Sequence, residues 1–273
     1  MSPREIAPRT VIEACFDPSG VAELSMVYDV ANAVGLADQP VRIAIRRLEA
    51  AGMLTQEGRG RKGRLVLTEQ GLSRDRADQG YLALLAAQDA GEPTWDGLWH
   101  VFTFSVPERF RSERDALRSS LVRLGAAPLA QGVYVSPFSL RAEVAEETID
   151  RYLITAEASR LSGPGLGSPE DIVETLWPAA AIEAEYVGLA EAIRLAEALP
   201  ATADVPERLA ASLRLAEALT HALEHDPLIP PELRSGPWRP PAIRHDFRRV
   251  WFALQRELPA VSLFEAYAEP GSF

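Results

Sequence analysis

Apolar residues recur with helical spacing along the first fifty positions of the chain. Residues 4–16 are predicted to form a helix that the turn Asp17–Gly20 ends. In the next segment, ELSMVYDVANAVG, apolar residues stand at i, i+3, i+4 and i+7, and Gly35 closes the pattern. This pattern predicts a second helix. A third helix is expected to have Asp38 as its N-cap and to tolerate Pro40 in its first turn.

The third predicted helix has two different faces. Its buried face is expected to consist of Val41, Ala44, Ile45 and Leu48. Its opposite face carries Gln39, Arg42, Ile43, Arg46 and Glu49. Such a helix fits the second helix of a helix-turn-helix, which enters the major groove of DNA. There arginine can pair with guanine, glutamine with adenine, and isoleucine can contact a thymine methyl. The alternative is that the polar face is simply the solvated side of an amphipathic helix.

A basic hairpin is predicted to follow this helix. Short strands are expected over residues 53–57 and 64–68, with GRGRKG as the tip between them. The cations of this hairpin are Arg59, Arg61, Lys62 and Arg64. A helix-turn-helix followed by a basic hairpin is a winged helix, in which the hairpin neutralises phosphates while the helix reads bases. The same glycines spell G-x-G-x-x-G, but a dinucleotide site needs a helix after this motif, and the strand-like RLVLT follows here.

The middle of the chain has the pattern of an α+β domain. A strand is predicted over 99–106, a helix over 108–124, and two further strands around 128–136. The order β-α-β-β suggests a ferredoxin-like unit. After the glycine-rich stretch 159–169, helical periodicity dominates. The chain is therefore predicted to be α+β with three domains: a winged helix-turn-helix over 1–80, a ferredoxin-like domain over 81–160 and an all-helical domain over 161–273.

Charge is distributed unevenly along the 273 residues. The formal net charge is −11, yet residues 41–78 hold nine Lys or Arg and five Asp or Glu. A basic region on an acidic protein indicates one anion-binding end. The chain has no apolar run long enough to cross a bilayer, and its start lacks the apolar segment of a signal peptide, so we expect a cytoplasmic protein. Its one cysteine, Cys15, is expected to be a buried hydrophobe.

Several motifs resemble the PaaX family of bacterial transcriptional repressors. In the middle of the chain these are W-x3-W, VPE, RxxRDxLRxxLxxLG and GVYVSP; in the N-terminal part they are VRIAIRRLEAAGML, GRGRKGR and LTEQG. The segment DPLIPPELRSGPWRPP is similar to a later part of the family. The resemblance implies repression of a catabolic operon, such as one for phenylacetate, that an aryl-CoA effector relieves. A homodimer on a palindromic operator is expected, because one winged helix buries too little of the groove for tight binding.

Two other functions remain open from the sequence. The central domain is similar in fold to a small CRISPR-associated metal-dependent nuclease, which holds its metal with an aspartate at the end of the first strand. Ser105 stands at the matching position, so we expect no nuclease activity. The second alternative is a CoA-thioester-binding protein or enzyme whose winged helix makes only protein contacts. Hydrolase and phosphate-loop motifs are absent from the sequence, so we expect neither an enzyme nor a cofactor.

The C-terminal part offers candidates for an effector site. A cationic stripe is expected from His245, Arg249, Phe252 and Arg256, with Arg244 and Arg248 beside it. The residues expected to bind an anionic, partly apolar effector are Trp238, Arg244, Arg248 and Trp251. A solvated or dimer-contact face is the alternative. The spacing of His221 and His225 is compatible with a metal, but solvated histidines at a helix end are the favoured interpretation and no metal site is predicted.

Overall fold

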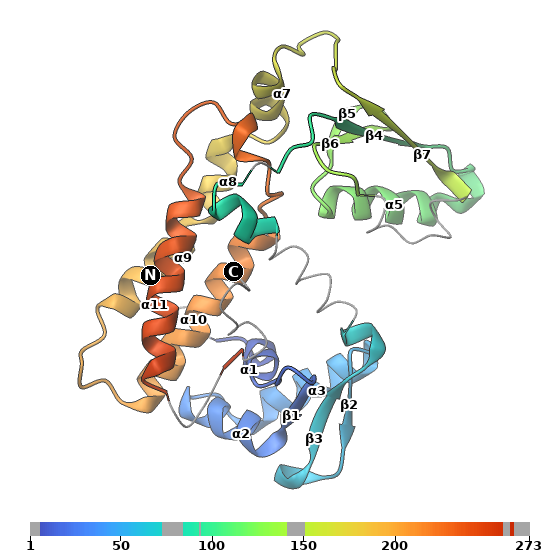
Figure 1. Ribbon diagram of the computed structural model, residues 1–273. Helices are drawn as coiled ribbons and strands as arrows, with labels where there is room; N and C mark the ends of the chain where they lie inside the picture. Colours follow the sequence, from blue (N-terminus) through green and yellow to red (C-terminus); the bar gives the residue numbers. More distant parts are fainter. Residues whose placement is uncertain (1–5, 73–83, 93, 141–150, 259–262, 265–273) are drawn as a thin grey trace. The chain divides into compact units, whose positions relative to one another are not determined.

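The computed structural model describes residues 6–72, 84–92, 94–140, 151–258 and 263–264. The chain divides into two compact units. The first comprises residues 1–86, 186–222 and 240–273, and the second comprises 87–185 and 223–239. The helical stretch 161–273, predicted as one domain, therefore contributes to both units. Helices and two antiparallel sheets are both present (Figure 1), which confirms the α+β class.

The N-terminal part of the first unit has the expected order of three helices and a hairpin. Its elements are α1 (Pro8–Ala14), β1 (Val21–Glu23), α2 (Leu24–Ala33), α3 (Asp38–Ala50), β2 (Leu54–Glu57), the 3-10 turn η1 (Gly60–Lys62) and β3 (Arg64–Leu67). The strands form an antiparallel sheet in the order β1-β3-β2. The short strand β1 was not expected. It adds an edge to the hairpin and leads directly into α2.

The start of α3 differs from the expectation. Ala37 is the N-cap and Asp38 is the first helical residue, without a side-chain capping hydrogen bond, so the prediction of an N-cap at Asp38 is wrong. The Asp38 carboxylate reaches the guanidinium of Arg42 one turn further along the helix instead, at 3.4 Å. An acid in the first turn is still favoured by the helix dipole.

The remaining helices of the first unit are α9 (Val187–Glu197), most of α10 (Val205–Glu224) and α11 (Pro240–Arg256). Of these helices, α10 shares a hydrophobic core with α1, α2 and α3. Leu209 and Leu213 of α10, together with Leu258 and Leu263, belong to this core. The backbone amide of Phe264 also donates a hydrogen bond to the carbonyl of Ala14 at 2.8 Å. The hydrophobic core of the N-terminal helices is thus completed by residues about two hundred positions later in the sequence.

The second unit contains the expected β-α-β-β order, followed by a fourth strand. Its elements are β4 (Trp99–Phe104), η2 (Glu108–Phe110), α5 (Arg111–Arg123), β5 (Ala127–Ala130), β6 (Val133–Ser136), β7 (Leu153–Ala158), α7 (Pro169–Leu176), α8 (Ala179–Glu185) and η4 (Pro231–Leu233). The sheet is antiparallel in the order β5-β6-β4-β7. Helix α5 packs on one of its faces, where Leu117 and Leu121 meet Phe102 and Tyr134 (Figure 1).

Cys15 and the glycine of LTEQG have structural roles. Cys15 is buried, as expected. Gly71 lies so close to the backbone that a Cβ atom there would stand 2.2 Å from the carbonyl oxygen of Met53. Thr68 holds this turn because its hydroxyl donates to the Gly52 carbonyl and accepts from the Gly71 amide. No described helix has both the length and the apolar composition needed to cross a membrane.

Candidate nucleic-acid interface

The polar face of α3 is exposed over its whole length. The five residues assigned to this face by their spacing, Gln39, Arg42, Ile43, Arg46 and Glu49, all have exposed side chains. Val41 and Ile45 are buried in the core, as predicted. Ile43 is unusual among them, because this large apolar side chain is 40% exposed. The helix therefore offers two arginines, a glutamine and an apolar group on one accessible surface.

The hairpin tip folds back toward α2. Gly58 and Gly60 have positive φ angles of 77° and 61°, which favour glycine. Gly63 is buried, and a Cβ atom there would lie 2.8 Å from the Glu57 carbonyl oxygen. Its own carbonyl accepts a hydrogen bond from the Leu24 amide at 2.9 Å. Gly63 therefore fixes the fold of the hairpin, whereas Gly60 stands in open space at its tip.

Arg61 is held against α2. Its guanidinium donates to the carboxylate of Asp29 and lies over the ring of Tyr28, with Cζ 5.9 Å from the ring centroid. The hydrogen bond to Asp29 raises the pKa of Arg61 above its ordinary value. Both charged side chains are at least half exposed, so the pair contributes little to stability but defines where the guanidinium lies.

Arg64 is also paired, whereas other cations of this surface are not. Arg64 and Glu57 face each other across the hairpin, and their side chains form an ion pair at 2.7 Å that raises the pKa of Arg64. Within the described parts of the chain, Arg46, Arg59 and Lys62 form no ion pair. These three exposed cations are available to an external anion without the loss of an internal partner.

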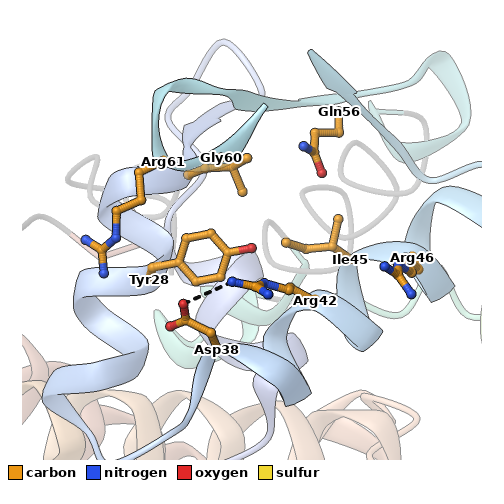
Figure 2. A pocket seen from close by; sticks show the side chains of 9 residues that line it. Tyr28, Asp38, Arg42, Ile45, Arg46, Gln56, Gly60 and Arg61 are labelled. Carbon is orange, nitrogen blue, oxygen red and sulfur yellow. Dashed lines mark hydrogen bonds and ion pairs between the residues drawn. The ribbon is translucent and has the colours of Figure 1, made fainter. Parts of the chain in front are cut away.

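A groove of about 410 Å³ lies between α2, α3 and the hairpin (Figure 2). It is lined by Leu24, Tyr28, Asp38, Arg42, Ile45, Arg46, Gln56, Gly60 and Arg61. Three of the predicted DNA-contacting arginines therefore meet at one concave surface. Neither Tyr28 nor Gln56 was predicted to belong to this surface, because neither stands in a basic motif.

The four effector candidates lie in different surroundings. Trp238 belongs to the second unit, and the other three residues belong to the first. Arg244 is almost fully buried and its Nη1 donates to the hydroxyl of Tyr186 at 2.8 Å. Trp251 is also buried and stacks on Phe247, with ring centroids 5.6 Å apart. Arg248 is half-buried on α11. Arg244 and Trp251 thus make contacts within the protein that explain their presence without a ligand.

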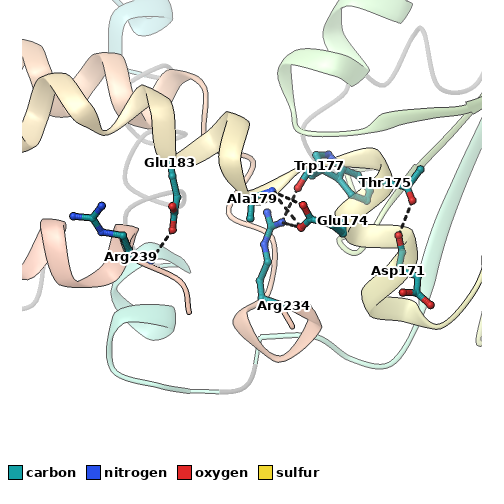
Figure 3. A network of polar contacts seen from close by, with 8 residues as sticks. All are labelled: Asp171, Glu174, Thr175, Trp177, Ala179, Glu183, Arg234 and Arg239. Carbon is teal, nitrogen blue, oxygen red and sulfur yellow. Dashed lines mark hydrogen bonds and ion pairs between the residues drawn. The ribbon is translucent and has the colours of Figure 1, made fainter. Parts of the chain in front are cut away.

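Trp238 contacts Arg234, which belongs to a polar network in the second unit; Figure 3 shows the network around Arg234. The guanidinium of Arg234 lies over the Trp238 ring, with Cζ 4.5 Å from its centroid, and Nη1 donates to the Trp177 carbonyl at 2.6 Å. Burial lowers the pKa of Arg234, while Asp226, Glu174 and Glu183 act in the opposite direction. This network connects the proline-rich segment 226–241 to α7 and α8.

Ser105, His221 and His225, for which the sequence predicts no metal, lie at the ends of regular elements. Ser105 directly follows β4 and is exposed. A hydroxyl therefore stands at the strand end where a nuclease of this fold would need a carboxylate. His221 lies in the last turn of α10, and His225 follows the end of that helix.

Comparison with known proteins finds a family model that matches the middle of the chain. Residues 92–172 match the model of the PaaX protein central Cas2-like domain. Among solved structures, the chain is similar to the uncharacterized protein Rv0674 from Mycobacterium tuberculosis, with a TM-score of 0.52 and 21% identity over 92% of this chain and 95% of that one. This similarity shows a shared fold. No curated protein matches the sequence. The domain match supports the resemblance to the PaaX family in this part of the chain.

Proposed function

We propose that the protein is a sequence-specific DNA-binding transcriptional regulator and that residues 6–72 act as its winged helix-turn-helix. The observation that carries this proposal is the juxtaposition of the exposed face of α3 with a basic hairpin on the same unit. A helix with exposed arginine and glutamine suits the major groove, and a hairpin with unpaired cations suits the flanking phosphates. The excess of positive charge in this part of an acidic chain supports the same interpretation.

The side chains of α3 are suited to base recognition. Gln39 and Arg42 lie in the first half of the helix, where the recognition helix of a helix-turn-helix contacts base edges. The ion pair of Arg42 with Asp38 is exposed and 3.4 Å long, so DNA can replace it at little cost. Ile43 is available for a thymine methyl because its side chain is already exposed.

The regulator is proposed to act as a homodimer and as a repressor of a catabolic operon. Two copies of the N-terminal unit would read a palindromic operator whose half-sites are separated by whole turns of DNA. An effector such as an aryl-CoA would release the protein by binding more tightly to a DNA-incompetent arrangement of the dimer. These parts of the proposal follow from the resemblance to the PaaX family.

We further propose that the central domain is not a nuclease. The exposed hydroxyl of Ser105 is neutral, so it is a weaker ligand of Mg²⁺ than the carboxylate that the nuclease has at this position. Incubation of the protein with DNA and RNA in magnesium should leave both substrates intact. Reproducible cleavage that EDTA abolishes would contradict this part of the proposal.

A mobility-shift assay tests the main proposal. The purified protein is mixed with DNA from upstream of its own gene and of the neighbouring genes, at physiological salt and with competitor DNA. A discrete shifted band is expected, and acyl-CoA esters added to the same reaction should weaken it. Absence of a band on all these fragments at micromolar protein would contradict DNA binding at these promoters and favour the CoA-thioester-binding alternative.

A further inference from the structure

The groove between α2, α3 and the hairpin contains a polar group that no described residue satisfies. Tyr28 is only 7% exposed, and its hydroxyl points into the groove (Figure 2). Its ring contacts Arg61, but among the described residues no hydrogen bond is made by the hydroxyl. A phenol that is nearly buried yet directs its oxygen into a cavity is suited to donate to a bound group.

The charges around this hydroxyl select an anion. Arg42, Arg46 and Arg61 line the groove, and Asp38 is the one acid among the lining residues. Arg46 has no ion pair within the described chain, so its full charge faces the groove. Gln56 also lines the groove, and its side-chain amide uses one hydrogen on the Gly58 carbonyl at 3.2 Å. The second hydrogen of that amide is available to a ligand.

The elements that form the walls of the groove also indicate which molecule would carry the anion. One wall is the face of α3 that is proposed to enter the major groove, and the other is the hairpin that is proposed to follow the backbone. A DNA strand bordering the major groove would pass between them. Arg61 is fixed by Asp29 and by the Tyr28 ring, so it helps to position the groove rather than reach outward.

We propose that this groove holds one phosphate of the DNA backbone, with the Tyr28 hydroxyl donating a hydrogen bond to it and Arg46 supplying the charge. The inference rests on the proposed DNA-binding function and adds a contact that the basic motifs do not contain. Because phosphate contacts carry no base information, the site would contribute equally to operator and random DNA. It would also fix the orientation of α3 in the major groove.

The test is fluorescence anisotropy of the full chain with a short labelled duplex at several salt concentrations. Tyr28→Phe removes only the hydroxyl and should weaken binding about tenfold on operator and random duplexes alike, since the acceptor is charged. Its salt slope should stay unchanged, because no charge is lost. Arg46→Ala should weaken binding and reduce the slope by about one unit.

Matched controls separate the groove from general effects. Tyr134→Phe removes the hydroxyl of a tyrosine that is equally buried but belongs to the sheet of the second unit. Arg47→Ala removes an exposed arginine that follows Arg46 on the same helix and does not line the groove. Both controls should lose less affinity than the corresponding groove variant. Unchanged circular dichroism and melting would show that Tyr28→Phe folds normally.

Three outcomes would overturn the inference, and they are distinguishable. Wild-type protein that binds no duplex would overturn the proposed function and the inference with it. Wild-type binding that Tyr28→Phe and Arg46→Ala leave unchanged would overturn the inference alone. Inorganic phosphate that binds the wild type but not Tyr28→Phe, and that does not compete with the duplex beyond the effect of chloride at equal ionic strength, would assign the groove to a free phosphate ion. A methylphosphonate at one backbone position that costs the wild type affinity, but not Tyr28→Phe, would support the contact directly.

Discussion

The carboxylate of Glu217 accepts a hydrogen bond from the backbone amide of Ala7 at 2.9 Å, although the two residues lie 210 positions apart. The same oxygen accepts a hydrogen bond from the Thr10 hydroxyl at 3.0 Å. Ala7 is the N-cap residue of α1 and has no side-chain oxygen that could serve the first turn. Glu217 of α10 therefore supplies this cap from a distant part of the chain, and its negative charge is favoured at the helix N-terminus.

Replacement of this carboxylate should destabilise the first unit. Glu217→Ala is expected to lower the free energy of unfolding by about 1 to 2 kcal/mol, because the amide of Ala7 loses its partner. Urea denaturation followed by circular dichroism measures this change. Glu224→Ala is the control, since Glu224 is an exposed glutamate in the last turn of the same helix. Equal effects of the two substitutions would show that the cap contributes nothing.

Arg42 should discriminate between bases. Arg42→Ala is expected to cost about 1 to 3 kcal/mol on the true operator and much less on random DNA. Arg42→Lys keeps the charge but loses the bidentate geometry, so it should restore binding to random DNA without restoring specificity. Binding constants on both duplexes test this prediction. Equal losses on the two duplexes would contradict base recognition by this residue.

The unpaired cations of the hairpin should control the salt dependence of binding. Arg59 and Lys62 have no ion pair within the described residues, whereas Arg64 is engaged by Glu57. Arg59→Ala combined with Lys62→Ala is therefore expected to weaken binding to all sequences and to reduce the salt slope by about two units. The affinity ratio between operator and random DNA should not change. An unaltered slope would mean that the hairpin does not contact phosphates.

Two glycines should respond in opposite ways to alanine. At Gly71 the added Cβ would meet the carbonyl oxygen of Met53 at 2.2 Å, so the backbone must move, and we expect a loss of roughly 2 kcal/mol or more. At Gly188, in the first turn of α9, a Cβ meets nothing within 4 Å. Gly188→Ala should therefore stabilise by up to about 1 kcal/mol. Thermal unfolding of both variants tests the contrast.

Cys15 should be inert in the folded protein. Burial raises the pKa of its thiol from 9.0 to about 12. At pH 8 a thiol reagent should thus label it only after urea unfolds the chain. Because the folded pKa lies above the unfolded one, the associated stability is fully present below about pH 9 and is lost as pH rises toward 12. Rapid labelling of the native protein would contradict the burial of this residue.

The sequence by itself determined most of the local structure. Apolar residues that recur with a period of 3.6 or 2 form a pattern among neighbouring residues, which can be recognised from the sequence alone. These patterns predicted α2, α3, the β2–β3 hairpin and the order β4-α5-β5-β6. They also predicted which residues of α3 are exposed. The resemblance of residues 95–137 to the PaaX family follows from residues close together in the chain, and the family match covers that segment.

Only the tertiary structure decided which of these residues meet. Three relationships depend on contacts between separate elements of the chain. These are the pairing of Arg61 with Asp29, the capping of α1 by Glu217 and the position of Tyr28 in the groove. No periodicity encodes such contacts, because they arise when separate elements pack together. The basic hairpin illustrates the difference: its sequence shows four equivalent cations, whereas packing fixes two of them in ion pairs and leaves the other two without an ion pair among the described residues.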